Sequence, residues 1–300
     1  MKRFFLFLLA ALTLLSACRP DLPQPSGPDP EAGTEARSFR AGQGETLCDF
    51  GSRTISLYYV KPEGWTPDRP LLLYFHGKGR RAEAICTALR ESAEKAKVFL
   101  VCPLFPETAF PEYASGNMLG HDGNGKRVLQ PREKWMFTAL TRFAAELKQR
   151  TGAAGPFVVL GHSAGSQLLH RYVLFGDTRI FSSIYCANAG WYTLPEADIP
   201  FPYGLKGLPP GTCSLETAFL RPVTLLVGEN DTKTSFGLRM TPRAAAQGKN
   251  RLERGRNFFA SAERAARRQG ITLRWTLETV PDTGHDSVKI GKYVLEKMIP

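Results

Sequence analysis

Runs of apolar residues alternate with amphipathic stretches along most of the chain. The runs typical of β-strands lie at 54–60, 71–75, 98–101, 157–160, 180–185 and 223–227. Some of them, such as Leu71–Phe75, are apolar throughout, which is typical of strands buried on both faces of a parallel sheet. Residues 271–277 alternate strictly and predict one more strand with a wetter face.

Segments with helical spacing separate these strands. Helices are expected at 81–96, 133–150, 164–175 and 287–298. The clearest is 133–150, where Met136, Leu140 and Phe143 share one face and Gly152 follows the end. Strands that alternate with helices in this way predict a single α/β domain, with a mainly parallel sheet flanked by helices.

The first residues have the pattern of an export signal. Lys2 and Arg3 precede a nearly continuous apolar stretch, residues 4–15, which has the length of a signal peptide and is short for a transmembrane helix. The residues Leu15-Ser16-Ala17-Cys18 resemble the lipobox of bacterial lipoprotein precursors. An ordinary secretory signal with an unrelated cysteine is the alternative.

The lipobox resemblance implies a signal peptide at 1–17 and a lipid on Cys18. The protein is then expected in the bacterial cell envelope, attached to the membrane through that lipid. Position 19 is Arg, not the Asp that retains enterobacterial lipoproteins in the inner membrane, so the outer membrane is favoured. Residues 18–46 contain several prolines and few apolar residues, so they are expected to be a disordered tether before a domain at 47–300.

Composition narrows the class of protein. The 300 residues are 43% apolar, which suffices for a large core and excludes a wholly disordered chain or a disulfide-stapled miniprotein. The six cysteines form no CxxC pair and no Cys/His cluster with zinc spacing. The Asp122-x-Asn124 pair lacks the further carboxylates of an EF-hand loop. Neither a metal site nor a cofactor is therefore predicted.

One motif carries nucleophilic chemistry. Gly161-His162-Ser163-Ala164-Gly165 follows the strand at 157–160 and precedes the helix at 164–175. Glycines two positions before and after the serine permit a sharp turn, and the helix N-terminus directs N–H groups toward a developing oxyanion. The alternative is an ordinary glycine-rich turn between a strand and a helix.

In this context the chain resembles the α/β-hydrolase superfamily. Gly228-Glu229-Asn230-Asp231 follows the strand at 223–227, and Thr283-Gly284-His285 lies near the end, so the chain has the family order of serine, acid and histidine. The resemblance implies that Ser163 attacks, His285 transfers the proton, and Asp231 orients the imidazole. Glu229 is the alternative acid.

A second turn also matches the family. His76-Gly77-Lys78 follows the strand 71–75 and resembles the His-Gly turn that supplies an oxyanion donor. The resemblance implies an oxyanion hole formed by the backbone N–H groups of Lys78 and Ala164.

The segment 188–212 exceeds what a simple connection needs. It follows the strand before the acid strand, where the family commonly inserts cap elements, and it is rich in aromatic residues, Pro and Gly. We expect Trp191 and Tyr192 to line the substrate pocket, with a packed surface loop as the alternative. A Cys186–Cys213 disulfide is expected to close this loop in the oxidising envelope; two buried thiols are the alternative.

Positive charge is concentrated at 239–268, which holds nine Lys/Arg against Glu253 and Glu263 and is expected to be helical. Contact with anionic lipid headgroups is one interpretation, and a solvated cationic face is the other. The whole chain has a net charge of +11, but no nucleic-acid-binding motif accompanies it, so nucleic acid is not an expected partner.

Together these features predict a lipid-anchored serine hydrolase that cleaves a carboxylic ester. The motifs most resemble those of secreted feruloyl esterases and polyhydroxyalkanoate depolymerases. A peptidase or amidase with the same triad is the enzymatic alternative, because the triad does not select ester over amide. A catalytically silent surface-binding lipoprotein is the alternative from another class.

Overall fold

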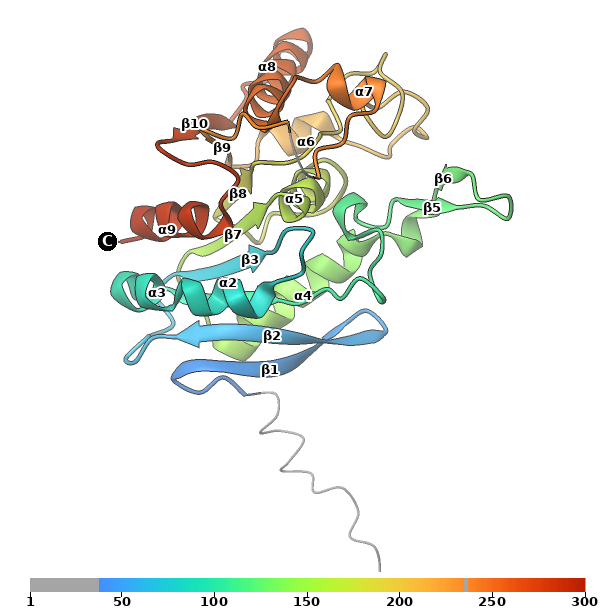
Figure 1. Ribbon diagram of the computed structural model, residues 1–300. Helices are drawn as coiled ribbons and strands as arrows, with labels where there is room; N and C mark the ends of the chain where they lie inside the picture. Colours follow the sequence, from blue (N-terminus) through green and yellow to red (C-terminus); the bar gives the residue numbers. More distant parts are fainter. Residues whose placement is uncertain (1–37, 235–236, 300) are drawn as a thin grey trace, which may run out of the picture. The chain divides into compact units, whose positions relative to one another are not determined.

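An eight-stranded sheet forms the centre of the computed structural model, which describes residues 38–234 and 237–299 (Figure 1). The strand order is β1-β2-β4-β3-β7-β8-β9-β10, and every pair from β4 to β10 is parallel, whereas β1 and β2 pair antiparallel. The strands of this sheet are β1 (Gly42–Phe50), β2 (Arg53–Lys61), β3 (Leu71–Phe75), β4 (Phe99–Pro103), β7 (Phe157–His162), β8 (Ser183–Ala187), β9 (Val223–Gly228) and β10 (Thr276–Val280). The predicted α/β fold class is confirmed.

Helices cover both faces of the sheet, as expected for buried parallel strands. The helices are α2 (Ala82–Ala88), α3 (Arg90–Ala96), α4 (Met136–Thr151), α5 (Ala164–Phe175), α6 (Leu215–Phe219), α7 (Pro242–Ala245), α8 (Arg251–Gln269) and α9 (Ser287–Lys297). Helices α2, α3 and α9 bury apolar residues against one face of the sheet, and α4, α5, α6 and α8 against the other. A two-stranded hairpin, β5 (Leu119–His121) and β6 (Arg127–Leu129), projects from the body (Figure 1).

Most predicted elements are present, but several of their bounds differ. Strand β1 starts at Gly42, inside the segment predicted to be tether, because residues 42–46 pair with β2. The helix expected at 81–96 is two helices that meet at Leu89, whose buried side chain packs against Gly291 of α9. The strand expected at 271–277 begins only at Thr276, because Arg274 and Trp275 hydrogen-bond to the last residues of α6.

The predicted signal peptide, the lipidation at Cys18 and residues 18–37 of the tether lie outside the described residues. Those features therefore stay predictions. No helix among residues 38–234 and 237–299 is long and apolar enough to cross a membrane.

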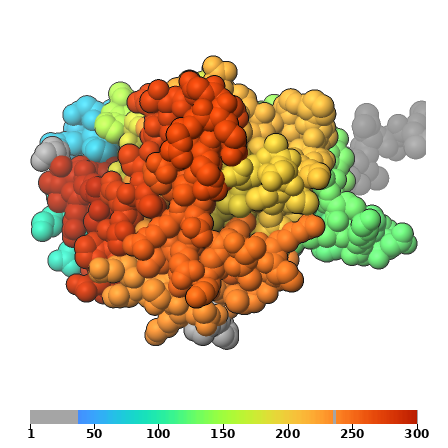
Figure 2. Space-filling model, turned by 90° about the horizontal axis from the view of Figure 1, so that it is seen from above, coloured from blue at the N-terminus to red at the C-terminus, as the bar shows by residue number. Residues whose placement is uncertain are grey.

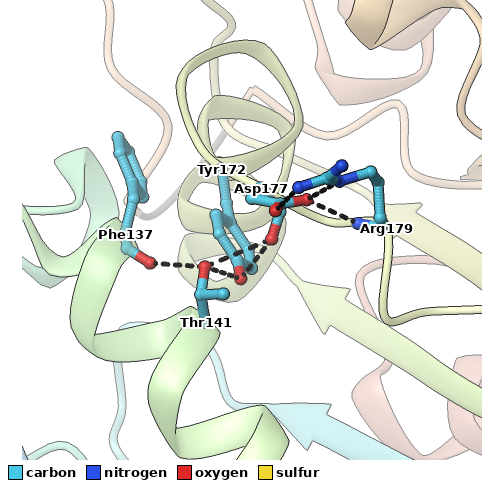
Figure 3. Close-up of polar contacts among 5 residues, drawn as sticks. All are labelled: Phe137, Thr141, Tyr172, Asp177 and Arg179. Atoms are coloured by element: carbon cyan, nitrogen blue, oxygen red, sulfur yellow. Dashed lines mark hydrogen bonds and ion pairs between the residues drawn. The ribbon is translucent and has the colours of Figure 1, made fainter.

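A hydroxyl network fixes α5 against α4 (Figure 3). The Thr141 hydroxyl donates to the carbonyl of Phe137 at 3.0 Å and lies 2.7 Å from the Tyr172 hydroxyl. Tyr172 donates in turn to the carbonyl of Asp177 at 2.8 Å, and the Asp177 carboxylate pairs with Arg179 at 2.6 Å. Because α5 begins directly after Ser163, this network anchors the far end of the helix that carries the candidate nucleophile.

Candidate active site

Ser163 occupies a strained turn between β7 and α5. Its backbone has φ 56° and ψ −112°, a region that costs a residue with a side chain roughly 1–3 kcal/mol. The flanking glycines permit this turn: a Cβ on Gly161 would lie 2.5 Å from the carbonyl oxygen of Gly165, and a Cβ on Gly165 would overlap the carbonyl of Phe75. The spacing of the motif therefore follows from close backbone contacts on both sides of the serine.

The structure brings together the three side chains that the sequence singled out. Nε2 of His285 lies 3.0 Å from Oγ of Ser163, and Nδ1 lies 2.8 Å from Oδ2 of Asp231. The Asp231 side chain is almost fully buried, whereas that of His285 is 31% exposed. A buried carboxylate beside one ring nitrogen and a hydroxyl beside the other is the geometry needed to transfer a proton from the serine.

The acid loop after β9 and the histidine loop after β10 are hydrogen-bonded to each other. The N–H groups of Glu229 and Asn230 donate to the carbonyls of Val280 and Thr283, at 3.0 and 2.8 Å. The carboxylate of Glu229 accepts the N–H of Asp282 at 3.0 Å. Of the two acids considered from the sequence, Asp231 therefore faces the imidazole and Glu229 caps the backbone of the neighbouring loop.

Asn188 is a residue that the sequence reasoning missed. It follows β8 with φ 51° and is fully buried. Its side-chain oxygen accepts the N–H of Gly228 at 2.8 Å, and its amide nitrogen donates to the carbonyl of Gly284 at 3.5 Å. Asn188 therefore connects the end of the acid strand to the residue that precedes His285. An asparagine directly after a buried strand was the only signal in the sequence.

The residues expected to form the oxyanion hole lie beside Ser163. Lys78 and Ala164 line one cavity together with Ser163, and a Cβ on Gly77 would lie 3.4 Å from the Cβ of Ser163. Within the described residues, neither the N–H of Lys78 nor that of Ala164 donates a loop or cap hydrogen bond. Their role as oxyanion donors stays a prediction.

Ser163 lines two cavities formed by the described residues. The Ser163–Trp191 cavity has a volume of about 400 Å³ and includes Ala164, Gln167 and Trp191 in its wall. The His285 cavity has about 470 Å³ and includes His285, Ser287 and Ile85. Ser163 lies in the wall of both, so a substrate can extend from the serine in two directions. A larger cavity of about 730 Å³ lies near Trp135 and Asp177 and contains none of the predicted site residues.

Only one of the two expected pocket aromatics lines a cavity beside Ser163. Trp191 does so, but Tyr192 is fully buried and stacks on Phe258 of α8 with ring centroids 4.3 Å apart. The expectation for Tyr192 is wrong because its backbone is fixed by Gln247, which bonds to both its N–H and its carbonyl. Figure 2 shows segment 188–212 (yellow) beside the orange segment that contains Gln247.

The predicted Cys186–Cys213 disulfide is also wrong, because both residues are free thiols. Cys186 is fully buried on β8 near Tyr192, whereas Cys213 lies beside Arg132. Burial raises the pKa of the Cys213 thiol to about 12. Side-chain contacts hold the loop instead: the N–H of Thr193 donates to His170 at 3.0 Å, and Arg171 donates to the Thr193 hydroxyl at 3.1 Å.

The basic segment 239–268 is only partly a solvated face. Arg251 and Arg254 are buried, and Arg264 and Arg268 pair with Glu196 at 3.3 and 2.6 Å. Contact of this segment with anionic headgroups stays a prediction.

Arg251 was not expected at the site. One of its terminal nitrogens lies 3.7 Å from Oδ1 of Asp231, and the residue lines both cavities. His162 lies nearby, with its ring centroid 4.6 Å from that of His285. Burial, with the charges of His285 and Arg251, holds the pKa of His162 well below its usual range, so this ring is neutral. Within the described residues, no group of three or more His, Cys, Asp or Glu side chains is placed to hold a metal ion.

Comparison with known proteins gives independent evidence on the fold and the activity. No family model and no curated sequence matches the chain. Among solved structures, it is similar to poly(aspartic acid) hydrolase-1 from Sphingomonas sp. KT-1, with 29% identity, 86% of this chain and 98% of that chain covered, and a TM-score of 0.77. It is also similar to LpqC, the poly(3-hydroxybutyrate) depolymerase from Bordetella parapertussis, with 29% identity, 86% and 88% coverage, and a TM-score of 0.75.

A more distant similarity supports the fold alone. Siderophore hydrolase EstB from Aspergillus nidulans has a TM-score of 0.51 at 13% identity, with 88% of this chain and 97% of that chain covered. The expected likeness to polyhydroxyalkanoate depolymerases is confirmed. With its sheet order, the serine turn after β7 and these neighbours, the chain has the α/β-hydrolase fold and is a serine hydrolase.

Proposed function

We propose that the protein hydrolyses a carboxylic ester, with Ser163 as nucleophile, His285 as general base and acid, and Asp231 as the orienting carboxylate. The observation that carries the proposal is the pair of hydrogen bonds through His285, at 3.0 Å to Ser163 and 2.8 Å to Asp231. A serine hydroxyl is a weak nucleophile unless a base of this kind removes its proton.

The reaction then proceeds in two halves. Oγ of Ser163 attacks the carbonyl carbon of the ester while its proton moves to Nε2 of His285. The former carbonyl oxygen becomes negative and accepts hydrogen bonds from the N–H groups of Lys78 and Ala164. The intermediate collapses, and the departing alcohol takes the proton from His285. Water then releases the acyl group by the same route. The buried charge of Asp231 stabilises the imidazolium in both halves.

Labelling with a fluorophosphonate probe tests the nucleophile. We expect the wild-type protein to be labelled and Ser163→Ala not to be, and Ser163→Ala and His285→Ala to lower kcat by about 10⁴-fold or more. Because the residues act as a unit, the double variant should be no slower than either single one. A double variant far slower than both, or labelling that persists without Ser163, would refute the mechanism.

Amide hydrolysis is the second candidate. It is favoured by the similarity to a poly(aspartic acid) hydrolase, because poly(aspartic acid) is a polyamide and poly(3-hydroxybutyrate) is a polyester. Matched aryl esters and aryl amides with the same acyl group separate the two candidates. Turnover of the ester alone supports an esterase, and comparable turnover of both supports an amidase.

We also propose that Cys18 is lipidated and anchors the domain in the bacterial envelope, with the outer membrane favoured over the inner. The lipobox-like residues before Cys18 support this. Metabolic labelling with a fatty acid should mark the wild-type protein and not Cys18→Ala, which should be recovered in soluble or uncleaved form. Equal labelling of both would refute the anchor.

A further inference from the structure

The Ser163–Trp191 cavity has an excess of positive side chains in its wall. Among the described residues of this wall, the only acids are Glu107 and Glu112, and Glu112 is already paired with Arg127 at 2.6 Å. Lys78 and Arg239 make no ion pair with any described residue. The lining cations are Lys78, Arg80, Arg127, Arg239 and Arg251.

A fully buried arginine lies directly behind this wall. Arg171 donates to the hydroxyl of Thr193 at 3.1 Å and to the carbonyls of Ala114 and Gln167 at 3.0 and 2.7 Å. All three acceptors are neutral groups. Its Nη2 has no hydrogen-bond partner in the described part of the chain. Burial, aided by the charges of Arg127 and Arg239, lowers the pKa of Arg171 to about 9, which still leaves it charged near pH 7.

Trp191 links the buried cation to the cavity. The guanidinium carbon of Arg171 lies 4.2 Å from the centroid of the Trp191 ring, and that of Arg239 lies 5.3 Å from it. Arg254 is also fully buried and donates to the carbonyls of Gly190 and Gly248, at 2.6 and 2.9 Å. Carbonyls have no net charge, so they do not neutralise the positive charge of these buried cations. A low-dielectric wall directs the electric field of the cations into the adjoining cavity.

The position of His285 separates the acyl side from the leaving-group side. The leaving group must lie within reach of His285, because it takes its proton from that ring. His285 lines the His285 cavity and is absent from the wall of the Ser163–Trp191 cavity. The Ser163–Trp191 cavity is therefore the one that holds the acyl group.

Resting on the proposed function, we infer that the acyl group of the substrate carries a carboxylate, which binds to Arg239 and Lys78 in the Ser163–Trp191 cavity. The carboxylate completes the charge balance of a cavity whose cations outnumber its acids. It also sets the orientation of the acyl chain, because it fixes the end remote from Ser163.

Two esters that differ only at the far end of the acyl chain test this inference. In mono-4-nitrophenyl adipate a carboxylate stands where 4-nitrophenyl hexanoate has a methyl group. We expect wild-type kcat/KM, corrected for spontaneous hydrolysis, to be about tenfold higher for the adipate ester, as for a hydrogen bond to a charged group. The adipate-to-hexanoate ratio should fall about tenfold in Arg239→Gln and be largely retained in Arg239→Lys.

Arg256→Gln is the matched control, because Arg256 is exposed on α8, outside the walls of both cavities, and its loss changes the net charge equally. It should leave the ratio unchanged. Hexanoate turnover with no adipate preference, or equal ratios in Arg239→Gln and Arg256→Gln, would overturn the inference and leave the esterase intact. Failure to hydrolyse either ester, together with no fluorophosphonate labelling, would overturn the proposed function and this inference with it.

Discussion

At the scale of single residues, the glycines around Ser163 maintain its strained backbone. Gly165 packs directly on the carbonyl of Phe75 at the end of β3, and Gly161 packs on the carbonyl of Gly165. Backbone atoms surround both positions, so a methyl group cannot be accommodated by rotation of a neighbouring side chain. The serine turn and the turn after β3 are consequently fixed relative to each other.

Gly165→Ala should therefore impair both stability and catalysis. We expect the free energy of unfolding to fall by about 1–3 kcal/mol, as in overpacked cores, and kcat/KM to fall because Ser163 shifts from the oxyanion donors. Urea unfolding and ester hydrolysis measure the two effects. Gly123→Ala is the control, since a Cβ there meets nothing within 4 Å, and it should change neither quantity.

Arg251 places a positive charge at the carboxylate that orients His285. A cation 3.7 Å from Asp231 offsets part of the negative charge of this buried carboxylate. Arg251 is thus expected to help hold the Asp231 carboxylate in place beside His285.

Arg251→Gln should lower kcat for ester hydrolysis, because Asp231 loses the cation that lies 3.7 Å from it. Arg251→Lys retains the charge and should keep kcat closer to that of wild type. Equal losses of kcat in the two variants would indicate a packing role alone.

At the scale of elements, the site depends on three loops at the carboxyl ends of neighbouring parallel strands. Asn188 after β8 bonds to Gly228 at the end of β9 and to Gly284 after β10. The acid and the histidine therefore share one positioning side chain, although 54 residues separate them in sequence.

Asn188→Ala should lower kcat and have a smaller effect on KM. The free energy of unfolding should fall by about 1–3 kcal/mol, because the buried N–H of Gly228 loses its acceptor. Thr141→Val is a suitable control: it breaks the network between α4 and α5 far from the acid and histidine loops, at a comparable cost in stability (Figure 3). The folded Thr141→Val protein should retain near wild-type kcat. Similar kcat losses in both variants would show a general effect of stability.

At the scale of the whole molecule, three buried histidines link folding to pH. Burial lowers the pKa of His76 to about 4 and holds the pKa values of His162 and His170 well below their usual range. For His76 and His170, Nε2 accepts a backbone N–H, so the ring must stay neutral in the fold. Each binds a proton near pH 6.5 once the chain unfolds.

The unfolded state therefore takes up more protons, so this contribution to stability is complete above about pH 6.5 and is lost as the pH falls. His76 alone should cost about 1.4 kcal/mol per pH unit between about pH 6.5 and 4. Urea unfolding at several pH values measures the slope, which should be shallower in His76→Gln and unchanged in His121→Gln, a change at the exposed end of β5. Equal slopes in all three proteins would contradict the assignment.

The amino-acid sequence determined the fold class and the order of the chemistry. Short apolar runs such as 71–75 and 157–160 are typical of strands buried on both faces of a parallel sheet. Glycines on both sides of a serine after such a strand are typical of a sharp turn at that serine. Ser163, Asp231 and His285 could be named for that reason: each lies beyond the carboxyl end of a strand, and those ends meet at one edge of a parallel sheet. These are local patterns, which periodicity and turn chemistry encode directly.

Tertiary structure alone decided everything that depends on contacts between distant segments. Periodicity could not place Tyr192 in the core rather than in a cavity, because its hydrogen bonds to Gln247 decide this. It also could not show that Cys186 and Cys213 remain free thiols. It also treated Arg251 as one cation among nine, although the start of α8 turns that residue toward Asp231. Side-chain pairing over long sequence separations has no period, so only the packed chain reveals it.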